Sequence, residues 1–456
     1  MRAPSRLKVS QRVRPRPPAA PVTAATRPSR LTAAAYACWV RLTRALERDH
    51  DPRMITERTG RHPTAVESGV MVGHPPPPEL RVGLHNWQQA PFNRWSFQHT
   101  RQVIPTANVS RGLGPVWELP KVTRALGDIS FDSAGGVEIT LADFLNDSWT
   151  DGLIVLKRGA IAFEAYRNEM GPQSRHIAMS VSKSITALVV GTLVGKNLID
   201  VNQLVTHYVP ELAGTAFDAA TVQHLLDMTV ANAWREDYFS DATEFWRLDV
   251  ACGWIPPRDG AATTLFDFFK ETRRDGQHGE QIAYSSLNPD LLGLIVQRVA
   301  DTPFPVVASR ELWTPMGAEF DADLAVDPAG MAVADGGYCI ALRDFARIGQ
   351  LFLNGGSANG RQVVPESWIS ECRNARHIPF HPTSYGANLA GALYHNQWWQ
   401  LEGRTIAMGI HGQMIAIDHS SDMVVAFLSS SPQPNAIRER EEQLGIVAAV
   451  SDALTA

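Results

Sequence analysis

Apolar runs in the middle of the chain have the lengths and residue types of regular secondary structure. Two of them, Leu153–Leu156 and Ala160–Ala165, are joined at Arg158-Gly159 and predict a β-hairpin. A long apolar run over Ser180–Val194 follows and predicts a buried helix that ends at a C-cap just beyond it. A strand hairpin followed by a buried helix is therefore expected in this part of the chain.

The pattern changes toward the C-terminus. Residues 205–330 predict mainly helical pieces broken by loops, and residues 436–454 predict a final helix. Between them lie three β-rich runs: Thr405–Gly409, Gln413–Asp418 and Met423–Ser429. Strands at both ends with helices between them predict an α/β (α+β) fold, in which one antiparallel sheet is flanked by helices and carries an inserted helical region. A cleft between the two parts is the expected place for a site.

The N-terminal residues differ in composition from the rest. Residues 1–30 hold eight basic side chains, six prolines and no acidic residue, and Pro75–Pro78 mark a linker. Such a segment buries too little apolar surface to offset the entropy lost on ordering. We therefore expect residues 1–75 to be a disordered, basic, proline-rich extension. Residues 76–456 should form the domain, with an α/β part over about 85–190 and 331–456 and a helical part over about 191–330.

Composition excludes several classes of partner. The chain is 44% hydrophobic and 20% charged, and its formal net charge of −5 gives no reason to expect nucleic acid binding. No apolar run approaches the about 18 residues of a membrane span, and no clear export signal is present, so we expect a cytoplasmic protein. Four widely spaced cysteines without a CxxC pair argue against a zinc site or a disulfide framework: Cys38, Cys252, Cys339 and Cys372.

The first candidate for chemistry is an S-x-x-K pattern, Ser180 and Lys183, at the start of the predicted helix. Positions i and i+3 share a helix face, so the hydroxyl and the amine can meet, and the helix N-terminus favours an oxyanion. A nucleophilic serine needs a nearby base, and a lysine can serve if burial lowers its pKa. The pattern alone is weak, because residues 5–8 contain another copy, and an N-cap serine beside a surface lysine is the structural alternative.

The segment HIAMSVSKSITALVVGTLVGKNLIDVNQLVTHYVPEL resembles the nucleophile region of the β-lactamase-related serine hydrolases. This family includes class C β-lactamases, D-alanyl-D-alanine peptidases, certain esterases and 6-aminohexanoate-dimer (nylon-oligomer) hydrolases, and the chain is most similar to the last group. Further similar blocks are Trp87–His99, Trp234–Trp254, Ala283–Val299, Asp335–Gly349 and Gly409–Ser430. The resemblance implies a β-lactamase/D-Ala-D-Ala-peptidase-like fold.

The resemblance also implies catalytic roles. Tyr284, in Tyr-Ser-Ser, matches the tyrosine of the family's second motif and would share a proton with Ser180 and Lys183, with Ser286 beside them. The strand that carries Lys-Thr-Gly in β-lactamases corresponds here to residues 409–413, whose Ile410 N–H would complete an oxyanion hole with the N–H of Ser180. Loss of that motif's lysine counts against an efficient β-lactamase.

Five further residues are expected to bind substrate. Tyr238 matches a loop tyrosine that contacts the substrate amide, and Asp249 matches an acidic residue that binds a free amino end. Trp254 matches a loop aromatic that closes over the site. Asp335 stands where an efficient amide hydrolase carries asparagine. His411 would tune the site, although a lone histidine in a strand is more often structural.

These residues predict a serine hydrolase that cleaves small linear amides or carboxylic esters through an acyl-enzyme on Ser180, with an aminohexanoate oligomer as the specific candidate. No G-x-S-x-G elbow surrounds Ser180, and no phosphate loop or HExxH is present, so we expect neither cofactor nor metal. Two alternatives stay open: a β-lactamase or D-alanyl-D-alanine peptidase, and a catalytically silent relative that binds a ligand in the same cleft. The expected partner is a small molecule; neither nucleic acid nor a membrane is expected, and a homodimer is a possible assembly.

Overall fold

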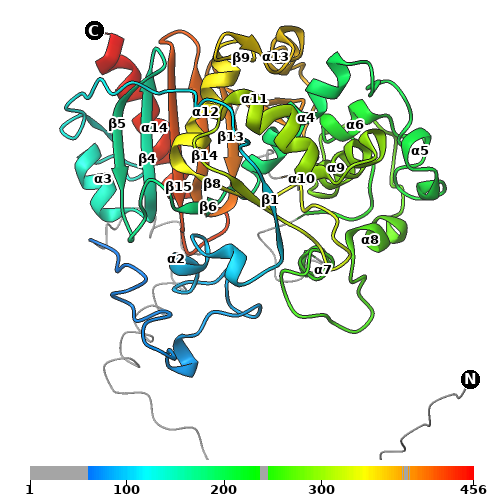
Figure 1. Ribbon diagram of the computed structural model, residues 1–456, viewed down its shortest axis with the longest axis horizontal. Helices are drawn as coiled ribbons and strands as arrows, with labels where there is room; N and C mark the ends of the chain where they lie inside the picture. The colour runs from blue at the N-terminus through cyan, green and yellow to red at the C-terminus, as the bar shows by residue number, and fades with distance from the viewer. Residues whose placement is uncertain (1–59, 237–244, 383, 385–388, 390, 456) are drawn as a thin grey trace, which may run out of the picture. The chain divides into compact units, whose positions relative to one another are not determined.

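The computed structural model describes residues 60–236, 245–382, 384, 389 and 391–455 (Figure 1). All of them belong to one unit, residues 55–456, and the other unit, residues 1–54, lies outside the described residues, as do the rest of the expected extension up to residue 59 and Tyr238.

A seven-stranded antiparallel sheet is built from both ends of this unit, as the sequence predicted. Its order is β11-β12-β13-β14-β15-β4-β5, so a C-terminal strand pairs with one from the N-terminal half, with Val425 opposite Val155. The bounds are β4 Thr150–Lys157, β5 Ala160–Tyr166, β11 Leu393–His395, β12 Trp398–Leu401, β13 Arg404–Gly409, β14 Gln413–Asp418 and β15 Met423–Ser429. The predicted hairpin and the three predicted C-terminal strands are confirmed.

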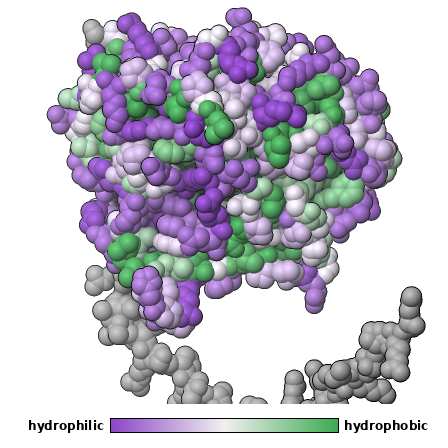
Figure 2. Space-filling model, viewed as in Figure 1, coloured by the Kyte–Doolittle hydropathy of each residue, from purple (hydrophilic) through white to green (hydrophobic). Residues whose placement is uncertain are grey.

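Both faces of this sheet are covered, which explains why its central strands read as unbroken apolar runs. Helix α12 (Leu342–Leu353) packs against β4, β14 and β15, while α14 (Ile437–Thr455) packs against β15. Because side chains alternate along a strand, Ile154 lies in one buried cluster and Val155 in the other. Figure 2 shows a mainly hydrophilic surface on the face that it draws, with hydrophobic residues in small separate patches.

The helical region is organised around α4 (Val181–Gly195) and α9 (Leu287–Ala300), which pack against each other. Residues 181–193 of α4 are all buried, as the apolar run predicted. The other helices are α2 Asn93–Ser96, α3 Leu141–Asp147, α5 Val205–Tyr208, α6 Val222–Leu226, α7 Trp246–Ala251, α8 Leu265–Glu271, α10 Phe304–Ala308, α11 Thr314–Met316 and α13 Glu366–Arg373.

A second, four-stranded antiparallel sheet was not predicted. Its order is β1 (Thr106–Val109), β7 (Ala322–Ala325), β8 (Tyr338–Ala341) and β6 (Arg175–Ile177). Strands of three or four residues are too short for alternation to be recognised in the sequence. This sheet matters for the site, because β6 leads directly to the start of α4.

Residues 60–75 differ from the expected disordered extension. Ala65 and Val70 are buried, and the Ala65 N–H donates to Asn168 Oδ1 at 2.8 Å. The His62 ring stacks on Trp149 with ring centres 3.8 Å apart. The apolar side chains and the aromatic contact of this short stretch let it pack on the domain. The prediction missed this because it rested on the basic, proline-rich composition of residues 1–30. The expected limits of the α/β and helical parts remain predictions.

One further feature concerns membranes. Within the described ranges no single helix combines the length and the apolar composition that a membrane span requires. One pair of helical segments, Leu287–Ala300 and Phe304–Met316, passes together by length and composition alone, and it is bent by 80°.

Candidate active site

Ser180 lies immediately before α4, where the chain turns from β6 into the helix. Met179 makes this turn with φ of 46°, a left-handed conformation that is uncommon for a residue with a side chain. Such strain persists only where the surroundings hold it, and it is concentrated at functional sites. The Ser180 side chain is therefore fixed at the N-terminus of a helix that is buried over residues 181–193, where backbone N–H groups favour a negative oxygen.

The Lys183 ammonium is 1% exposed and bonded on several sides. Its Nζ donates to Ser180 Oγ at 2.8 Å and to Ser286 Oγ at 2.9 Å. The same Nζ lies 5.2 Å from the centre of the Tyr284 ring and 3.2 Å from the backbone oxygen of Asp335. The structure thus brings Ser180, Lys183 and Tyr284 together, as the resemblance predicted.

The pKa of Lys183 is shifted in the opposite direction to the one that burial alone would give. Burial does lower the pKa of this amine, but nearby acidic groups act more strongly in the opposite direction, and the net pKa is above its ordinary value. Those groups are, in decreasing order, Tyr284, Asp335, Glu236 and Asp290. The acidic groups around Lys183 therefore favour its ammonium form over the neutral amine that burial alone would favour. The sequence could not show how many acidic groups the fold places around it.

Glu236 was not identified from the sequence. This side chain is 3% exposed, and its Oε1 accepts a hydrogen bond from Ser286 Oγ at 2.9 Å, while the Ser286 N–H donates to its other oxygen. Ser286 therefore connects the carboxylate of Glu236 to the ammonium of Lys183. In the sequence Glu236 is followed by a second acidic residue, and nothing in the local pattern marks Glu236 as buried.

Asp290 is a second site residue that the sequence analysis missed. It lies one helical turn after Ser286 on α9, and its Oδ1 accepts the Asp335 N–H at 2.9 Å. Burial, followed by the charge of Asp335, raises the pKa of Asp290 well above its usual range. Asp290 Oδ2 and Asp335 Oδ1 are buried without a nitrogen or hydroxyl donor, and a proton on Asp290, shared with Asp335, satisfies both.

The Cys252 thiol lies near this carboxyl pair. Its sulfur and one oxygen each of Asp290 and Asp335 lie within 4.8 Å of one another, a spacing that could suit a metal ion. However, the Lys183 ammonium already lies 3.4 Å from Asp335 Oδ2 and opposes a second cation. The electrostatics fit a shared proton better than a metal.

A small cavity beside Ser180 collects most of the remaining predicted residues. Ser180, Asp249, Trp254, Asp335 and Ile410 all line it. Thus three of the five predicted substrate-binding residues face the predicted nucleophile, although they come from separate parts of the sequence.

Asp249, on α7, lines this cavity with a carboxyl group whose pKa is shifted upward. Burial raises its pKa to about 7; a hydrogen bond from Gln88 acts in the opposite direction, and the charges of Asp335 and Glu236 add to the rise. Gln88 also lines the cavity. Near neutral pH this carboxyl group therefore changes charge readily, and a cation placed beside it would favour its ionised form.

The Ile410 backbone approaches Ser180 at the end of β13. A Cβ atom on Gly409 would lie 2.8 Å from Ala178 O and 3.0 Å from Ser180 N, so only glycine permits this close passage. Ile410 follows directly and lines the cavity. The arrangement brings the two segments that carry the expected oxyanion-hole amides side by side.

Two predicted residues are not brought to the cavity. His411 is 2% exposed, its Nδ1 lies 2.7 Å from Ser431 O, and it does not line the cavity. Burial lowers the pKa of His411 to about 4, so the ring is neutral and donates from Nδ1. The structure thus supports the structural role that the sequence analysis left open and not a substrate contact. Tyr238 lies outside the described residues.

Comparisons with known proteins agree with this geometry. The β-lactamase family matches residues 141–449. A 6-aminohexanoate-dimer hydrolase from Paenarthrobacter ureafaciens is 35% identical over 412 residues, which cover 88% of this chain and 100% of that protein. A solved Bacillus anthracis structure, provisionally assigned as a 6-aminohexanoate-dimer hydrolase, has a TM-score of 0.76 and 25% identity and covers 83% of this chain and 98% of its own.

A more distant structure shares the fold alone. A family VIII carboxylesterase has a TM-score of 0.52 and 14% identity, and the match covers 68% of this chain and 95% of that one. Together with the family match over residues 141–449 and the 35% identity of a full-length relative, these findings assign the chain. It belongs to the β-lactamase family and is, by that membership, a serine-type hydrolase.

Proposed function

We propose that this protein hydrolyses small linear amides or carboxylic esters through an acyl-enzyme formed on Ser180. The observation that carries the proposal is the hydrogen bond of 2.8 Å between Lys183 Nζ and Ser180 Oγ at the edge of a cavity. A purely structural N-cap serine would give no reason to bury a lysine beside it, because burying a charge is costly.

In the first step, Ser180 Oγ attacks the substrate carbonyl and forms the new C–O bond. The Ser180 proton passes to the Lys183–Tyr284 pair after that pair has lost one proton, so that either the Lys183 amine or the Tyr284 phenolate is free to accept it. The two groups lie side by side and act as one coupled acid–base unit. The pair then protonates the leaving amine or alcohol as the carbonyl–leaving-group bond breaks. Water then attacks the acyl-enzyme and gives its proton to the pair. The bond between the acyl carbon and Ser180 Oγ breaks, the pair returns the proton to Oγ, and the acid is released.

The oxyanion that forms in both steps needs hydrogen-bond donors. The N–H groups of Ser180 and Ile410 are the proposed donors, supported by the close passage of Gly409 beside Ser180 N. Preorganised donors of this kind contribute strongly, and the loss of one typically costs about 100- to 1,000-fold in kcat.

The proposed substrate carries an ammonium group at one end. Asp249 lines the cavity with a pKa of about 7 and would bind such a group as the carboxylate. The relative from Paenarthrobacter ureafaciens is named for the 6-aminohexanoate dimer, a linear amide with a free amino end. Esters are the more permissive substrates, because an alcohol leaves with less assistance than an amine. The cytoplasmic location and the possible homodimer remain predictions.

Turnover of 4-nitrophenyl acetate and of the 6-aminohexanoate dimer tests the proposal. We expect ester hydrolysis by the wild type and its loss in Ser180→Ala. Ser184→Ala is the matched control, because Ser184 lies on the same helix and donates to Gln397 O. A folded wild type without turnover would contradict the proposal and favour the silent ligand-binding relative. Equal turnover in wild type and Ser180→Ala would show that another group acts as the nucleophile.

A further inference from the structure

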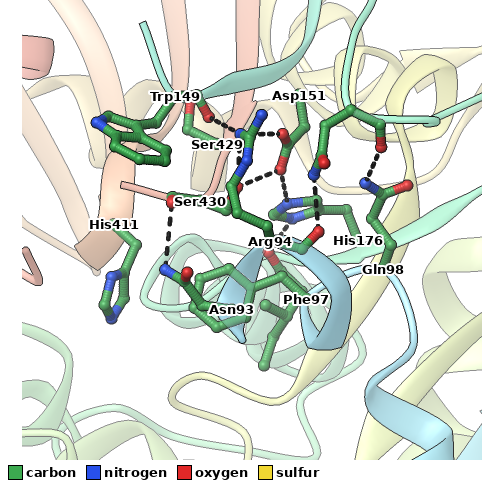
Figure 3. Close-up of polar contacts among 12 residues, drawn as sticks. Asn93, Arg94, Phe97, Gln98, Trp149, Asp151, His176, His411, Ser429 and Ser430 are labelled. Atoms are coloured by element: carbon green, nitrogen blue, oxygen red, sulfur yellow. Dashed lines mark hydrogen bonds and ion pairs between the residues drawn. The ribbon is translucent and has the colours of Figure 1, made fainter. Parts of the chain in front are cut away.

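We propose that a buried charged network around Asp151 positions the two backbone N–H groups of the oxyanion hole. The network joins Asp151 to Arg94, His176 and Ser430, and Figure 3 shows these side chains converging from separate segments. The inference rests on the proposed function, because it concerns the amides assigned there to the oxyanion.

Asp151, in β4, is completely buried and contacts three polar groups. Arg94 Nη1 donates to its Oδ1 at 2.8 Å, Ser430 Oγ donates to its Oδ2 at 2.7 Å, and His176 Nε2 lies 3.1 Å from the same Oδ2. Arg94 Nη1 also donates to Ser430 Oγ at 3.0 Å. All four side chains are at most 3% exposed, so the network is shielded from solvent.

One arm of the network leads to Ser180. His176 belongs to β6, which runs directly into Met179 and Ser180. Along this path the Ile177 N–H donates to Phe97 O at 2.9 Å, and the Ala178 N–H donates to Tyr338 O at 2.7 Å. The path ends at the left-handed Met179, so the position of the Ser180 N–H depends on how firmly β6 is held.

The other arm leads to Ile410. Ser431 follows Ser430 and pairs with His411, because its N–H donates to His411 O at 3.1 Å and its own oxygen accepts His411 Nδ1–H at 2.7 Å. Asn93 Nδ2 donates to the oxygens of Ser430 and Ser431 at 3.2 and 2.9 Å. His411 has φ of 61°, so the residue after Ile410 is left-handed, like the residue before Ser180.

The network thus links both strained residues that flank the proposed oxyanion amides. A buried ion pair is a weak source of stability, since well-packed apolar side chains in its place are often as stable or more so. An arginine–carboxylate contact instead fixes the relative position of the two segments that it joins, because the planar guanidinium and the carboxylate meet in a defined geometry. We infer that Asp151, Arg94 and His176 are positioning residues that act through the backbone.

The test compares Asp151→Asn with Asp344→Asn. Asp344 is also completely buried and pairs with a buried arginine, Arg347 Nη1, at 2.8 Å, but it lies on α12, and its other partners are the N–H groups of Glu319 and Phe320. The readouts are the rate of phosphonylation of Ser180, the affinity for phenylboronic acid, which forms a tetrahedral serine adduct, and the melting temperature. A structural role alone would change only the last of these.

We expect Asp151→Asn to slow phosphonylation about 10- to 100-fold and to weaken boronate binding in parallel. Asp344→Asn should lower the melting temperature while leaving both other readouts near the wild-type values. Ser430→Ala is the second variant if Asp151→Asn does not fold, because it keeps the Arg94–Asp151 pair and removes only the link toward His411.

Wild-type phosphonylation and boronate binding in folded Asp151→Asn or, where that variant does not fold, in Ser430→Ala would overturn the inference. An equal loss in Asp344→Asn would overturn it too, because the effect would then follow from stability alone. These outcomes leave the proposed function standing. If the wild type itself is not phosphonylated at Ser180, the proposed function fails and the inference fails with it.

Discussion

Lys183 is held by two hydroxyl groups, those of Ser180 and Ser286, and its charge is set by the acidic groups around it. Asp335 is the nearest of the carboxylates, with Oδ2 at 3.4 Å from Nζ. Asp290 accepts the Asp335 N–H and favours its protonated form, since burial and the charge of Asp335 raise its pKa. Because Asp335 is next to Lys183 and Asp290 has the raised pKa, substitution of the two aspartates should differ in effect.

Asp335→Asn should shift the rising limb of the pH profile of kcat/KM to lower pH. Removing a negative charge beside the ammonium lowers the pKa of Lys183, so the Lys183–Tyr284 pair accepts a proton from Ser180 at a lower pH. A shift of about one pH unit is expected for a charge at this distance. Asp290→Asn should shift the profile less, because Asp290 tends to keep its proton and makes the smallest of the four charge contributions to the Lys183 pKa. An unchanged profile in Asp335→Asn would contradict this view of the site.

Asp249→Asn should raise KM for an amide substrate with an ammonium end and leave KM for a neutral ester unchanged. The pKa of about 7 means that the carboxylate forms as the pH rises through neutrality. In the wild type, KM for the 6-aminohexanoate dimer should therefore fall between pH 6 and 8, whereas KM for 4-nitrophenyl acetate should not. In Asp249→Asn the dimer KM should rise about 10-fold or more and lose its pH dependence. A parallel change for the neutral ester would argue against an ammonium site.

The same carboxyl group should affect stability. Its pKa in the folded protein, about 7, lies above the ordinary value of 3.8. Below pH 3.8 the group is protonated in both the folded and unfolded states; as the pH rises toward 7, the unfolded state ionises first and stability is lost. The melting temperature of Asp249→Asn should therefore exceed that of the wild type by a margin that grows from pH 4 to pH 7. A margin that shrinks over this range would contradict the raised pKa.

At the scale of elements, β6, α4, α9 and β13 build the site, and of these β6 and α4 are joined by a short connection. The sequence predicted α4 and β13 closely, because each buries a long enough apolar stretch to show a pattern. It did not predict β6 or β8, whose three or four residues show none. Glu236 and Asp290 were missed for a related reason, because their burial depends on packing between elements and not on local spacing.

Gly409→Ala tests the contact between β13 and the start of α4. The added Cβ would lie 2.8 Å from Ala178 O and 3.0 Å from Ser180 N, both backbone atoms, so one of the two segments must move. We expect kcat for the ester to fall about 10- to 100-fold, because a small displacement of the oxyanion donors is costly. Gly114→Ala is the matched control, since its Cβ would meet no atom within 4 Å. Wild-type kcat in Gly409→Ala would argue that this passage does not shape the site.

On the scale of the whole molecule, the domain is closed by pairing a C-terminal strand with one from the N-terminal half, β15 with β4. Strand-rich ends around a helical middle were enough to predict this sheet. The start of the domain was predicted too late, because Ala65 and Val70 pack on it despite the basic residues that precede them. The pKa of Lys183 could not be predicted from the sequence, since the groups that shift it come from three separate parts of the chain, at residue 236, residues 284–290 and residue 335.

The central claim is that Ser180 forms the covalent bond with substrate. Its most direct test is intact-protein mass spectrometry after incubation with a fluorophosphonate, followed by peptide mapping, on wild type and Ser180→Ala. We predict a single adduct on the wild type that maps to Ser180 and none on the variant. An adduct that maps to another residue, or one that persists in Ser180→Ala, would contradict the assignment of the nucleophile.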